Sequence, residues 1–179
     1  DRTPTPDGGV MRLHQEDTCQ ALSVRPADKY ESDGGPRAVT VARLLATRSD
    51  PPNVARNLDD FVAYLAYNYL TMSPDAHAKN YSLLLLAGQV RLAPLYDVAS
   101  GAPYDAAEQT GLPSAAMAIG GAREFGYVHR RHWEQFAQDA GLDPERVVDR
   151  VRELAAAVPD AMADTFNTVA EINGAAELR

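Results

Sequence analysis

The clearest pattern of apolar and polar positions begins after the Pro51-Pro52 pair. Apolar side chains recur there at steps of three and four residues: Val54, Leu58, Phe61, Leu65 and Tyr69. This spacing predicts a long helix with one face in a core. Pro74 is expected to end this helix, because the residue before a proline is pushed away from the helical region. A shorter helix is predicted from Pro36 to about Thr47.

Two short apolar runs follow, residues 81–86 and 90–94, with Ala87-Gly88-Gln89 between them. Runs of this length around a glycine turn predict a β-hairpin. Nearer the start, Asp7-Gly8-Gly9 predicts a turn between two strand-like pieces. Residues 15–22 are expected to form a short helix, whose acidic start would favour the helix dipole.

The last third of the sequence predicts helices, after a looser stretch rich in glycine and alanine. One helix is expected over residues 132–140, with Gly141 closing it. Asp143-Pro144 supplies an N-cap and a first helical position for the next one. Pro159 is expected to separate that helix from a final helix ending near residue 172. The whole pattern predicts a mainly α-helical fold with one small β-hairpin at its centre.

The composition is that of a globular chain of moderate size. Its 179 residues are 45% hydrophobic and 23% charged, which suits one domain or lobe over residues 1–179. The net charge of −8 argues against a surface built to lie along nucleic acid. Cys19 is the single cysteine, which excludes an internal disulfide framework and fits a reducing compartment. The longest strongly apolar run, residues 83–87, is too short to span a bilayer, so we expect a cytoplasmic protein with no membrane contact.

A polar cluster lies between the long helix and the hairpin, in the segment Asp75-Ala76-His77-Ala78-Lys79-Asn80. Phosphoryl transfer needs a carboxylate that accepts the proton of the attacking hydroxyl, and a few oxygen ligands that hold Mg²⁺ against the nucleotide phosphates. Protein kinases place these groups as an Asp, an Asn five residues later and a second Asp after a short hairpin. Asp75, Asn80 and Asp97 follow this layout.

A purely structural interpretation competes with this one. An Asp and an Asn at this spacing often occur together by chance. Asp75 could be a turn residue after Pro74, and Asn80 could cap the start of a strand. The position of the cluster, between an apolar helix and an apolar hairpin, favours a functional site on a rigid mount. The spacing alone leaves both interpretations open.

Several blocks of the sequence resemble a known family, in that family's order and at similar spacing: Gln15-Glu16-Asp17, Lys29-Tyr30-Glu31-Ser32-Asp33-Gly34-Gly35-Pro36, Asp75-x-His77-x-Lys79-Asn80, Leu92-x-Pro94-x-Tyr96-Asp97 and Met117-Ala118-Ile119-Gly120-Gly121. Over most of residues 1–140, the chain resembles the HipA-type serine/threonine kinase toxins. The resemblance implies the C-terminal lobe of a protein-kinase-like α+β fold.

By this resemblance, Asp75 is the catalytic base, and Asn80 and Asp97 are the Mg²⁺ ligands. His77 and Lys79 would lie beside the phosphates of ATP, and Tyr96 would line the same pocket. The residues themselves leave simpler roles open. His77 could bond to the backbone of its own loop, and Lys79 could be a solvated surface charge.

Two other polar segments have less certain roles. The glycine-rich stretch 29–36 is predicted to be a loop without regular structure. A structural or substrate-facing role near the site is favoured for it, because Gly34-Gly35 permits backbone conformations closed to other residues. Residues 129–132 form a basic cluster, for which a solvated loop before a helix is favoured over contact with a partner or with DNA phosphates.

The sequence also departs from the family. A complete kinase needs a lobe with a phosphate-covering loop and a nucleotide-pairing lysine, and neither Gly8-Gly9 nor Gly34-Gly35 has such a pattern. Asp1-Arg2 resembles the end of the family's hinge between lobes, so we expect the chain to begin partway through a longer protein that carries the N-terminal lobe. Met72-Ser73-Pro74 stands where many members have Gly-Asn, which implies a remodelled approach to Asp75.

The family implies that the parent protein transfers the γ-phosphoryl group of ATP to a protein serine or threonine, with Mg²⁺. Its implied substrates are aminoacyl-tRNA synthetases. Its implied partner is a helix-turn-helix antitoxin, through which alone DNA would be contacted. Two other hypotheses stay open. One is a catalytically inert lobe that binds an antitoxin or another partner; the other is a metal-dependent phosphoesterase, for which His14, His129 and His132 lack supporting acidic motifs.

Overall fold

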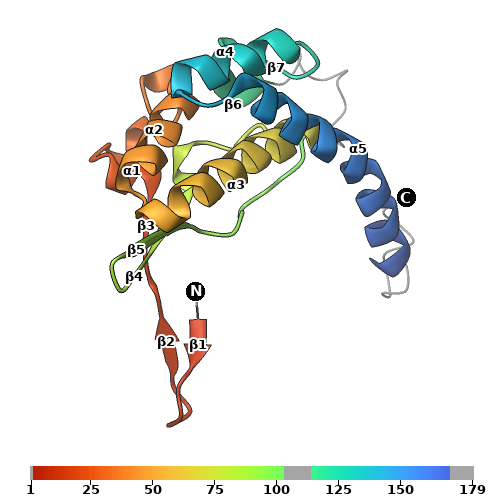
Figure 1. The fold of residues 1–179 in the computed structure, drawn as a ribbon. Helices are drawn as coiled ribbons and strands as arrows, with labels where there is room; N and C mark the ends of the chain where they lie inside the picture. The colour runs from red at the N-terminus through yellow and green to blue at the C-terminus, as the bar shows by residue number, and fades with distance from the viewer. Residues whose placement is uncertain (1, 103–113, 170–179) are drawn as a thin grey trace.

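The structure is a computed structural model that describes residues 2–102 and 114–169. The longer helices form the body of the molecule, and two of the small antiparallel sheets lie against them, whereas the hairpin at the N-terminus projects away from the body (Figure 1). In chain order, the elements are β1 (Arg2–Pro4), β2 (Val10–Arg12), β3 (His14–Asp17), α1 (Thr18–Ala21), η1 (Pro26–Asp28), η2 (Glu31–Asp33), α2 (Ala38–Arg48), α3 (Pro51–Leu70), η3 (Ala78–Asn80), β4 (Ser82–Leu86), β5 (Gln89–Leu92), β6 (Ser114–Ile119), β7 (Ala122–Glu124), α4 (Arg130–Ala140) and α5 (Pro144–Val169).

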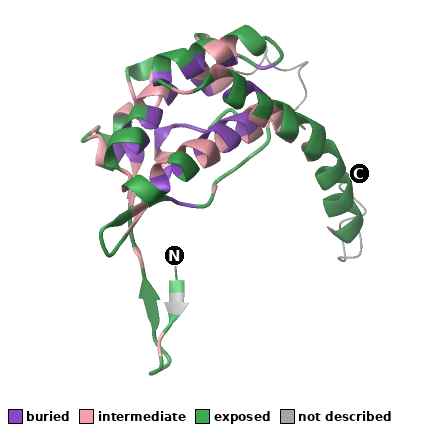
Figure 2. Cartoon of the chain, viewed as in Figure 1, coloured by how far each residue is buried: buried purple, intermediate pink, exposed green. Residues whose placement is uncertain are grey.

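The core lies between α2, α3, α4 and the first part of α5, where the buried positions gather (Figure 2). Phe61 of α3 and Phe136 of α4 are fully buried, as is Leu45 of α2. Full burial of such a side chain contributes about 1.5–3 kcal/mol. Of the predicted apolar face of α3, Phe61 and Leu65 are buried, and Val54, Leu58 and Tyr69 are half-buried. This face fixes the end of the helix from which the segment with Asp75 leaves.

The predicted hairpin is confirmed as β4 and β5, with Leu83 opposite Leu92. A strand that was not predicted, β3, pairs antiparallel with the other edge of β4, so that Glu16 lies opposite Leu83. The three-stranded sheet β3-β4-β5 packs beside α3. The turn predicted at residues 7–9 is also present, between β1 and β2.

The expectation of a helix over residues 15–22 was wrong in its first part. Residues up to Asp17 are extended, because their backbone groups pair with β4. The helix α1 covers only Thr18–Ala21. Asp17 is its N-cap and accepts a hydrogen bond from the backbone N–H of Gln20 at 2.9 Å, while the Gln20 side chain accepts one from the N–H of Asp17.

The looser stretch expected before the last helices contains a second hairpin, β6 and β7, with Ile119 opposite Ala122. Gly120 and Gly121 form its turn at φ +53° and +84°. A Cβ on Gly120 would lie 2.1 Å from the carbonyl oxygen of His132, so only glycine lets this turn pack on α4. Short alanine-rich strands carry little apolar alternation, which is why the pattern did not predict them.

The expected break at Pro159 was also wrong, because α5 runs without interruption from Pro144 to Val169. Proline fixes φ near the helical value and removes one hydrogen bond, so a helix can continue through it at a cost. The part of α5 beyond Pro159 extends away from the body and is largely exposed (Figures 1 and 2). The predicted end near residue 172 lies outside the described residues.

The other predicted boundaries hold closely. The helix α2 occupies Ala38–Arg48, and α3 ends at Leu70, one turn before Pro74. Gly141 closes α4 in the left-handed conformation, at φ +73°. The loop 29–36 was expected to be irregular, but it holds the short 3₁₀ turn η2. Among the described helices, none is long and apolar enough to cross a membrane.

Candidate active site

The segment 75–80 is held from two sides. It leaves the end of α3, passes through the turn η3 and enters β4. The carbonyl oxygen of Ala78 accepts a hydrogen bond from the hydroxyl of Thr18 at 2.6 Å, and the backbone N–H of Thr18 donates to Tyr81 at 2.9 Å. Thr18 and Ala78 are fully buried. The capped helix α1 therefore anchors this loop, which makes it a rigid mount for the polar side chains.

Asp75 and Asn80 lie together within this loop. The side-chain nitrogen of Asn80 donates to the carbonyl oxygen of Asp75 at 2.9 Å. Asn80 is buried, whereas the carboxylate of Asp75 is 58% exposed. Because the amide nitrogen is used in this bond, Oδ1 is the atom of Asn80 that could ligate a cation.

Tyr96, the residue before Asp97, bonds to Lys79, the residue before Asn80. The Tyr96 hydroxyl donates to the carbonyl oxygen of Lys79 at 2.5 Å and lies 2.6 Å from the hydroxyl of Ser82. The phenol has one proton, so Ser82 is the donor in the second bond. Burial raises the pKa of Tyr96, which keeps the phenol protonated as this geometry requires. Asp97 is thus brought to the loop that holds Asn80.

A second tie holds the chain after Asp97. The backbone N–H of Gly101 donates to the carbonyl oxygen of Met72 at 2.8 Å, just before Pro74. Met72 and Asp97 both have left-handed backbones, at φ +52° and +57°. The described residues contain no ready group of three or more His, Cys, Asp or Glu side chains that could hold a metal. A cation held by Asn80 and Asp97 would draw its other oxygen ligands from phosphates and water.

His77 is buried behind Asp75. Its Nε2 lies 3.8 Å from Oδ1 of Asp75, and its ring meets the ring of Tyr30 edge-on at a centroid distance of 5.0 Å. Burial lowers the pKa of His77, with Lys29 adding to the effect, so the imidazole is held neutral. Its Nδ1 is buried and has no hydrogen-bond partner among the described residues. The imidazole lies beside the Asp75 carboxylate without a hydrogen bond to it, and contact of His77 with a phosphate stays a prediction.

Lys79 is paired with Asp17. Its ammonium nitrogen lies 2.7 Å from Oδ2 of Asp17, and this hydrogen bond raises the pKa of Lys79. The ion pair connects the loop to the N-cap of α1, so the side chain is more than a solvated surface charge. A role for Lys79 beside the phosphates stays a prediction as well.

Sequence reasoning missed Tyr30 as a site residue. The loop 29–36 lies against the segment 75–80, and the hydroxyl of Tyr30 donates to Oδ1 of Asp75. Glu31, the next residue, accepts from the backbone N–H of Ala118 at 2.7 Å, which ties the same loop to β6. The loop motif was visible in the sequence, but nothing in it indicated which residue would contact Asp75.

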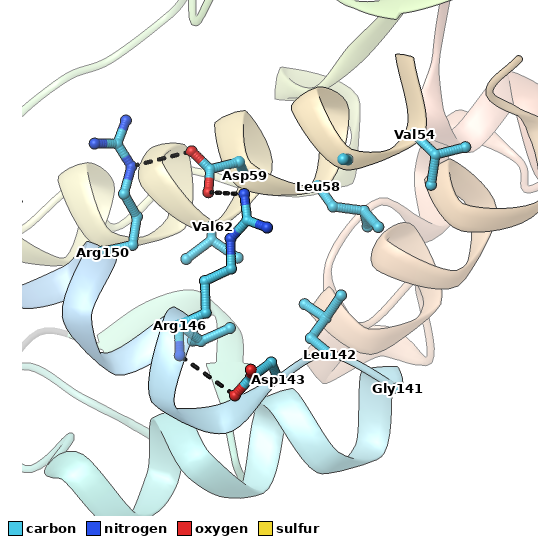
Figure 3. Close-up of a pocket in the computed structure, with 11 residues that line it drawn as sticks. Val54, Leu58, Asp59, Val62, Gly141, Leu142, Asp143, Arg146 and Arg150 are labelled. Atoms are coloured by element: carbon cyan, nitrogen blue, oxygen red, sulfur yellow. Dashed lines mark hydrogen bonds and ion pairs between the residues drawn. The ribbon is translucent and has the colours of Figure 1, made fainter. Parts of the chain in front are cut away.

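A groove of about 290 Å³ lies elsewhere, between α3 and the start of α5 (Figure 3). Its walls are mainly apolar and include Val54 of α3 and Leu142. On its rim, the carboxylate of Asp59 pairs with the guanidinium groups of Arg146 at 3.3 Å and Arg150 at 3.5 Å. No predicted site residue lines it.

The predicted basic cluster, residues 129–132, is also separate from the segment 75–80. His129 caps α4, and its backbone N–H donates to His132 at 2.9 Å.

Comparison with known proteins identifies the family. The family described as HipA-like C-terminal domain matches residues 1–162. The chain belongs to this family. The resemblance stated from the motifs is thereby confirmed, and the sheets and helices described above agree with the expected α+β, kinase-like lobe.

Relatives of this HipA-like domain include kinases by name. It is 34% identical over 174 residues to a putative kinase, Y4mE, of Sinorhizobium fredii. The matched residues cover 96% of this chain and 40% of the relative. It is 28% identical over 165 residues to the serine/threonine-protein kinase toxin HipA of Shewanella oneidensis. The matched residues cover 88% of this chain and 37% of the relative.

The fold has a solved counterpart in a complex of HipA, HipB and operator DNA from a toxin–antitoxin system of Shewanella oneidensis MR-1. The TM-score is 0.79 at 26% identity, over 92% of this chain and 40% of the other. The HipA-like domain therefore spans about two fifths of the length of these relatives.

Proposed function

We propose that the parent protein of this HipA-like lobe is a serine/threonine protein kinase that uses ATP and Mg²⁺. Asp75 would be its base, and Asn80 and Asp97 its metal ligands. The observation that carries the proposal is the tie between Tyr96 and the carbonyl oxygen of Lys79, at 2.5 Å. It holds the residue before Asp97 against the loop of Asp75 and Asn80, which supports the grouping that phosphoryl transfer requires.

In the proposed reaction, Asp75 accepts the proton of a serine or threonine hydroxyl of the protein substrate. The hydroxyl oxygen forms a bond to the γ-phosphorus of ATP, and the bond from that phosphorus to the β–γ bridging oxygen breaks to leave ADP. The exposure of the Asp75 carboxylate suits this role, because an incoming hydroxyl must reach it. Bound Mg²⁺ would neutralise charge on the phosphates. Asn80 and Asp97 supply oxygens of the kind this ion prefers.

His77, Lys79 and Tyr96 complete the proposed ATP-binding set in supporting positions. His77 lies behind the base, Lys79 is bonded to Asp17, and Tyr96 connects the metal-ligand segment to the loop. Of these, Lys79 is the one whose charge could turn toward a phosphate, since its side chain is 32% exposed. Binding of ATP would then compete with Asp17 for the ammonium group.

The test is autophosphorylation of the full-length parent with radiolabelled ATP and Mg²⁺. We expect incorporation by the wild type, and its loss in Asp97→Asn and in Asp75→Asn. Asp149→Asn is the matched control, because among the described residues the carboxylate of Asp149 on α5 pairs with Arg152 alone, at 3.2 Å and in an exposed position. Full labelling of the Asp97→Asn protein would contradict the assignment of Asp97.

The proposal extends to partners of the parent protein. The solved relative is described in a complex with HipB and operator DNA. We infer that this parent also pairs with an antitoxin of the helix-turn-helix kind and reaches DNA only through it, in the cytoplasm. An aminoacyl-tRNA synthetase is the proposed protein substrate. Labelling a panel of purified synthetases with the parent kinase tests this, and transfer to none of them would overturn it.

A second candidate is that this lobe by itself is a catalytically inert module that binds an antitoxin or another partner. The coverage of two fifths of each relative favours it for the 179-residue chain alone. Calorimetry with ATP and Mg²⁺ distinguishes the two, because micromolar binding by this chain alone contradicts the inert interpretation.

A further inference from the structure

The carboxylate of Asp75 has one fixed oxygen and one open side. Tyr30, which lies 45 positions earlier in the sequence, donates its hydroxyl proton to Oδ1. Among the described residues, this is the side-chain hydrogen bond that the carboxylate receives, since Nε2 of His77 is 3.8 Å away. The rest of the group stays largely exposed. A carboxylate held by a single neighbour keeps its second oxygen for another donor.

The backbone around Tyr30 is tightly constrained. The carbonyl oxygen of Tyr30 accepts hydrogen bonds from the N–H groups of Gly35 at 2.8 Å and Asp33 at 3.1 Å. A Cβ on Gly35 would lie 2.1 Å from the carbonyl oxygen of Asp28 and 2.6 Å from that of Tyr30. Real side chains do not fit such distances, so the turn closes around Tyr30 only with glycine at position 35.

The Tyr30 ring is also held on its faces and edges. The buried His77 ring meets it edge-on at 5.0 Å, and the Lys29 ammonium lies 5.0 Å from its centroid. The backbone N–H of Ala78 points to the carbonyl oxygen of Lys29, at 3.4 Å. The loop and the segment 75–80 are thus connected through backbone, ring and hydroxyl. Together, these contacts hold the Tyr30 hydroxyl in one position.

We propose that Tyr30 is a positioning residue for Asp75, which pins Oδ1 so that Oδ2 faces the hydroxyl of the protein substrate. The inference rests on the proposed function, because it assigns Asp75 as the base. Tyr30 itself touches neither substrate nor nucleotide in this scheme. It acts through the orientation of the carboxylate, and small errors in such an orientation cost about 10²-fold in rate.

The test is the Tyr30→Phe variant of the full-length parent, with ATP and Mg²⁺ in a single-turnover autophosphorylation assay. We expect the maximal rate to fall about 10- to 100-fold, while the ATP concentration at half-maximal rate stays within about twofold. Tyr69→Phe is the matched control. Its hydroxyl accepts from the N–H groups of Gly126 at 2.6 Å and Val128 at 3.1 Å, so its loss disturbs structure without touching Asp75.

The outcomes separate the two claims. An inactive wild type overturns the proposed function. An active wild type with an equally active Tyr30→Phe protein overturns the role of Tyr30 alone. Equal losses of rate in Tyr30→Phe and Tyr69→Phe, with equal losses of thermal stability, also overturn it, because they indicate a structural effect only.

A spectroscopic readout follows the bond directly. The hydrogen bond to Asp75 raises the pKa of Tyr30, with burial adding to the shift. In protein labelled with ¹³C at the tyrosine Cζ, the Tyr30 signal, assigned by its absence from Tyr30→Phe, should titrate at lower pH in Asp75→Asn than in the wild type. Unchanged titration would show that the bond does not form in solution, and would overturn the inference.

Discussion

Asn57 provides the sharpest stability test of how α3 supports the site. Its side-chain nitrogen donates to the hydroxyl of Ser49 at 2.7 Å and to the carbonyl oxygen of Val90 at 2.8 Å. Its side-chain oxygen accepts from the backbone N–H of Leu92 at 2.9 Å. Asn57 is 2% exposed, so water does not replace these partners. The residue therefore fastens β5, the strand that leads to Asp97, onto the helix at Val90 and at Leu92.

We expect Asn57→Ala to remove about 3–4 kcal/mol of unfolding free energy. Each lost hydrogen bond costs about 1 kcal/mol net, and a buried partner such as the N–H of Leu92 left without an acceptor costs more. For a chain of this size, that loss lowers the melting temperature by roughly 6–16 °C. Asn53→Ala is the control one turn earlier, since Asn53 donates to Asp50 at 2.8 Å and reaches β5 only indirectly, through the Asp50 carboxylate that accepts from the N–H of Val90 at 2.8 Å. It should cost about 1.5 kcal/mol, because the lost bond is a single one to a carboxylate.

The assay is urea unfolding of the 179-residue chain and both variants, followed by circular dichroism and by fluorescence of Trp133. This residue is the single tryptophan of the sequence and is 4% exposed in α4, so its emission reports on the core. The gain in helix propensity from Asn to Ala is below about 0.7 kcal/mol at either position, which is smaller than the difference expected between the two variants. Equal unfolding free energies for Asn57→Ala and Asn53→Ala would refute the claim that Asn57 fastens β5.

Two further predictions concern the loop and the buried histidine. Gly35→Ala should lower autophosphorylation of the parent at least as much as Tyr30→Phe, because the new Cβ meets the Asp28 carbonyl oxygen at 2.1 Å. Gly34→Ala meets nothing within 4 Å and strains only the left-handed backbone, so it should cost less, and the reverse order of activities would contradict this. Burial lowers the pKa of His77 in the folded chain below its ordinary value of 6.5. As the pH falls, the imidazole therefore binds a proton in the unfolded chain before it does in the folded chain, so the free energy of unfolding is unaffected above about pH 6.5 and decreases below it. The wild type should then lose more unfolding free energy between pH 7 and 5 than His77→Gln does, and equal losses would contradict this prediction.

Local sequence patterns predicted most of the helical framework. The repeat from Val54 to Tyr69 specified α3, because a buried helix face needs apolar residues at that period. Gly141 predicted the end of α4, because a left-handed residue closes a helix with little strain only when it lacks a Cβ. The hairpin of β4 and β5 was predicted by its turn and its apolar runs. In each case, the determinant lies within one segment of the chain.

The missed features depend on contacts between distant segments. The pattern predicted a helix over most of strand β3, because its pairing partner, β4, lies 65 to 71 positions later and leaves no periodic signal in residues 14–17. The contact between Tyr30 and Asp75 has the same origin. Asn57 was overlooked because a polar residue inside a helical repeat resembles a solvated position until its partners on β5 are known.

The left-handed backbones of Met72 and Asp97 connect these structural contacts to function. A non-glycine residue held in this region costs of order 1–3 kcal/mol and persists only where its surroundings determine it. Both residues flank a tie: Tyr96 bonds to the loop just before Asp97, and Gly101 bonds to Met72 just before the segment with Asp75. Glycine would relieve the strain at position 97, but it would remove the carboxylate. Aspartate adopts this conformation more readily than most residues with a Cβ, and Asp97 adopts it with its carboxylate retained, as its proposed role as a metal ligand would require.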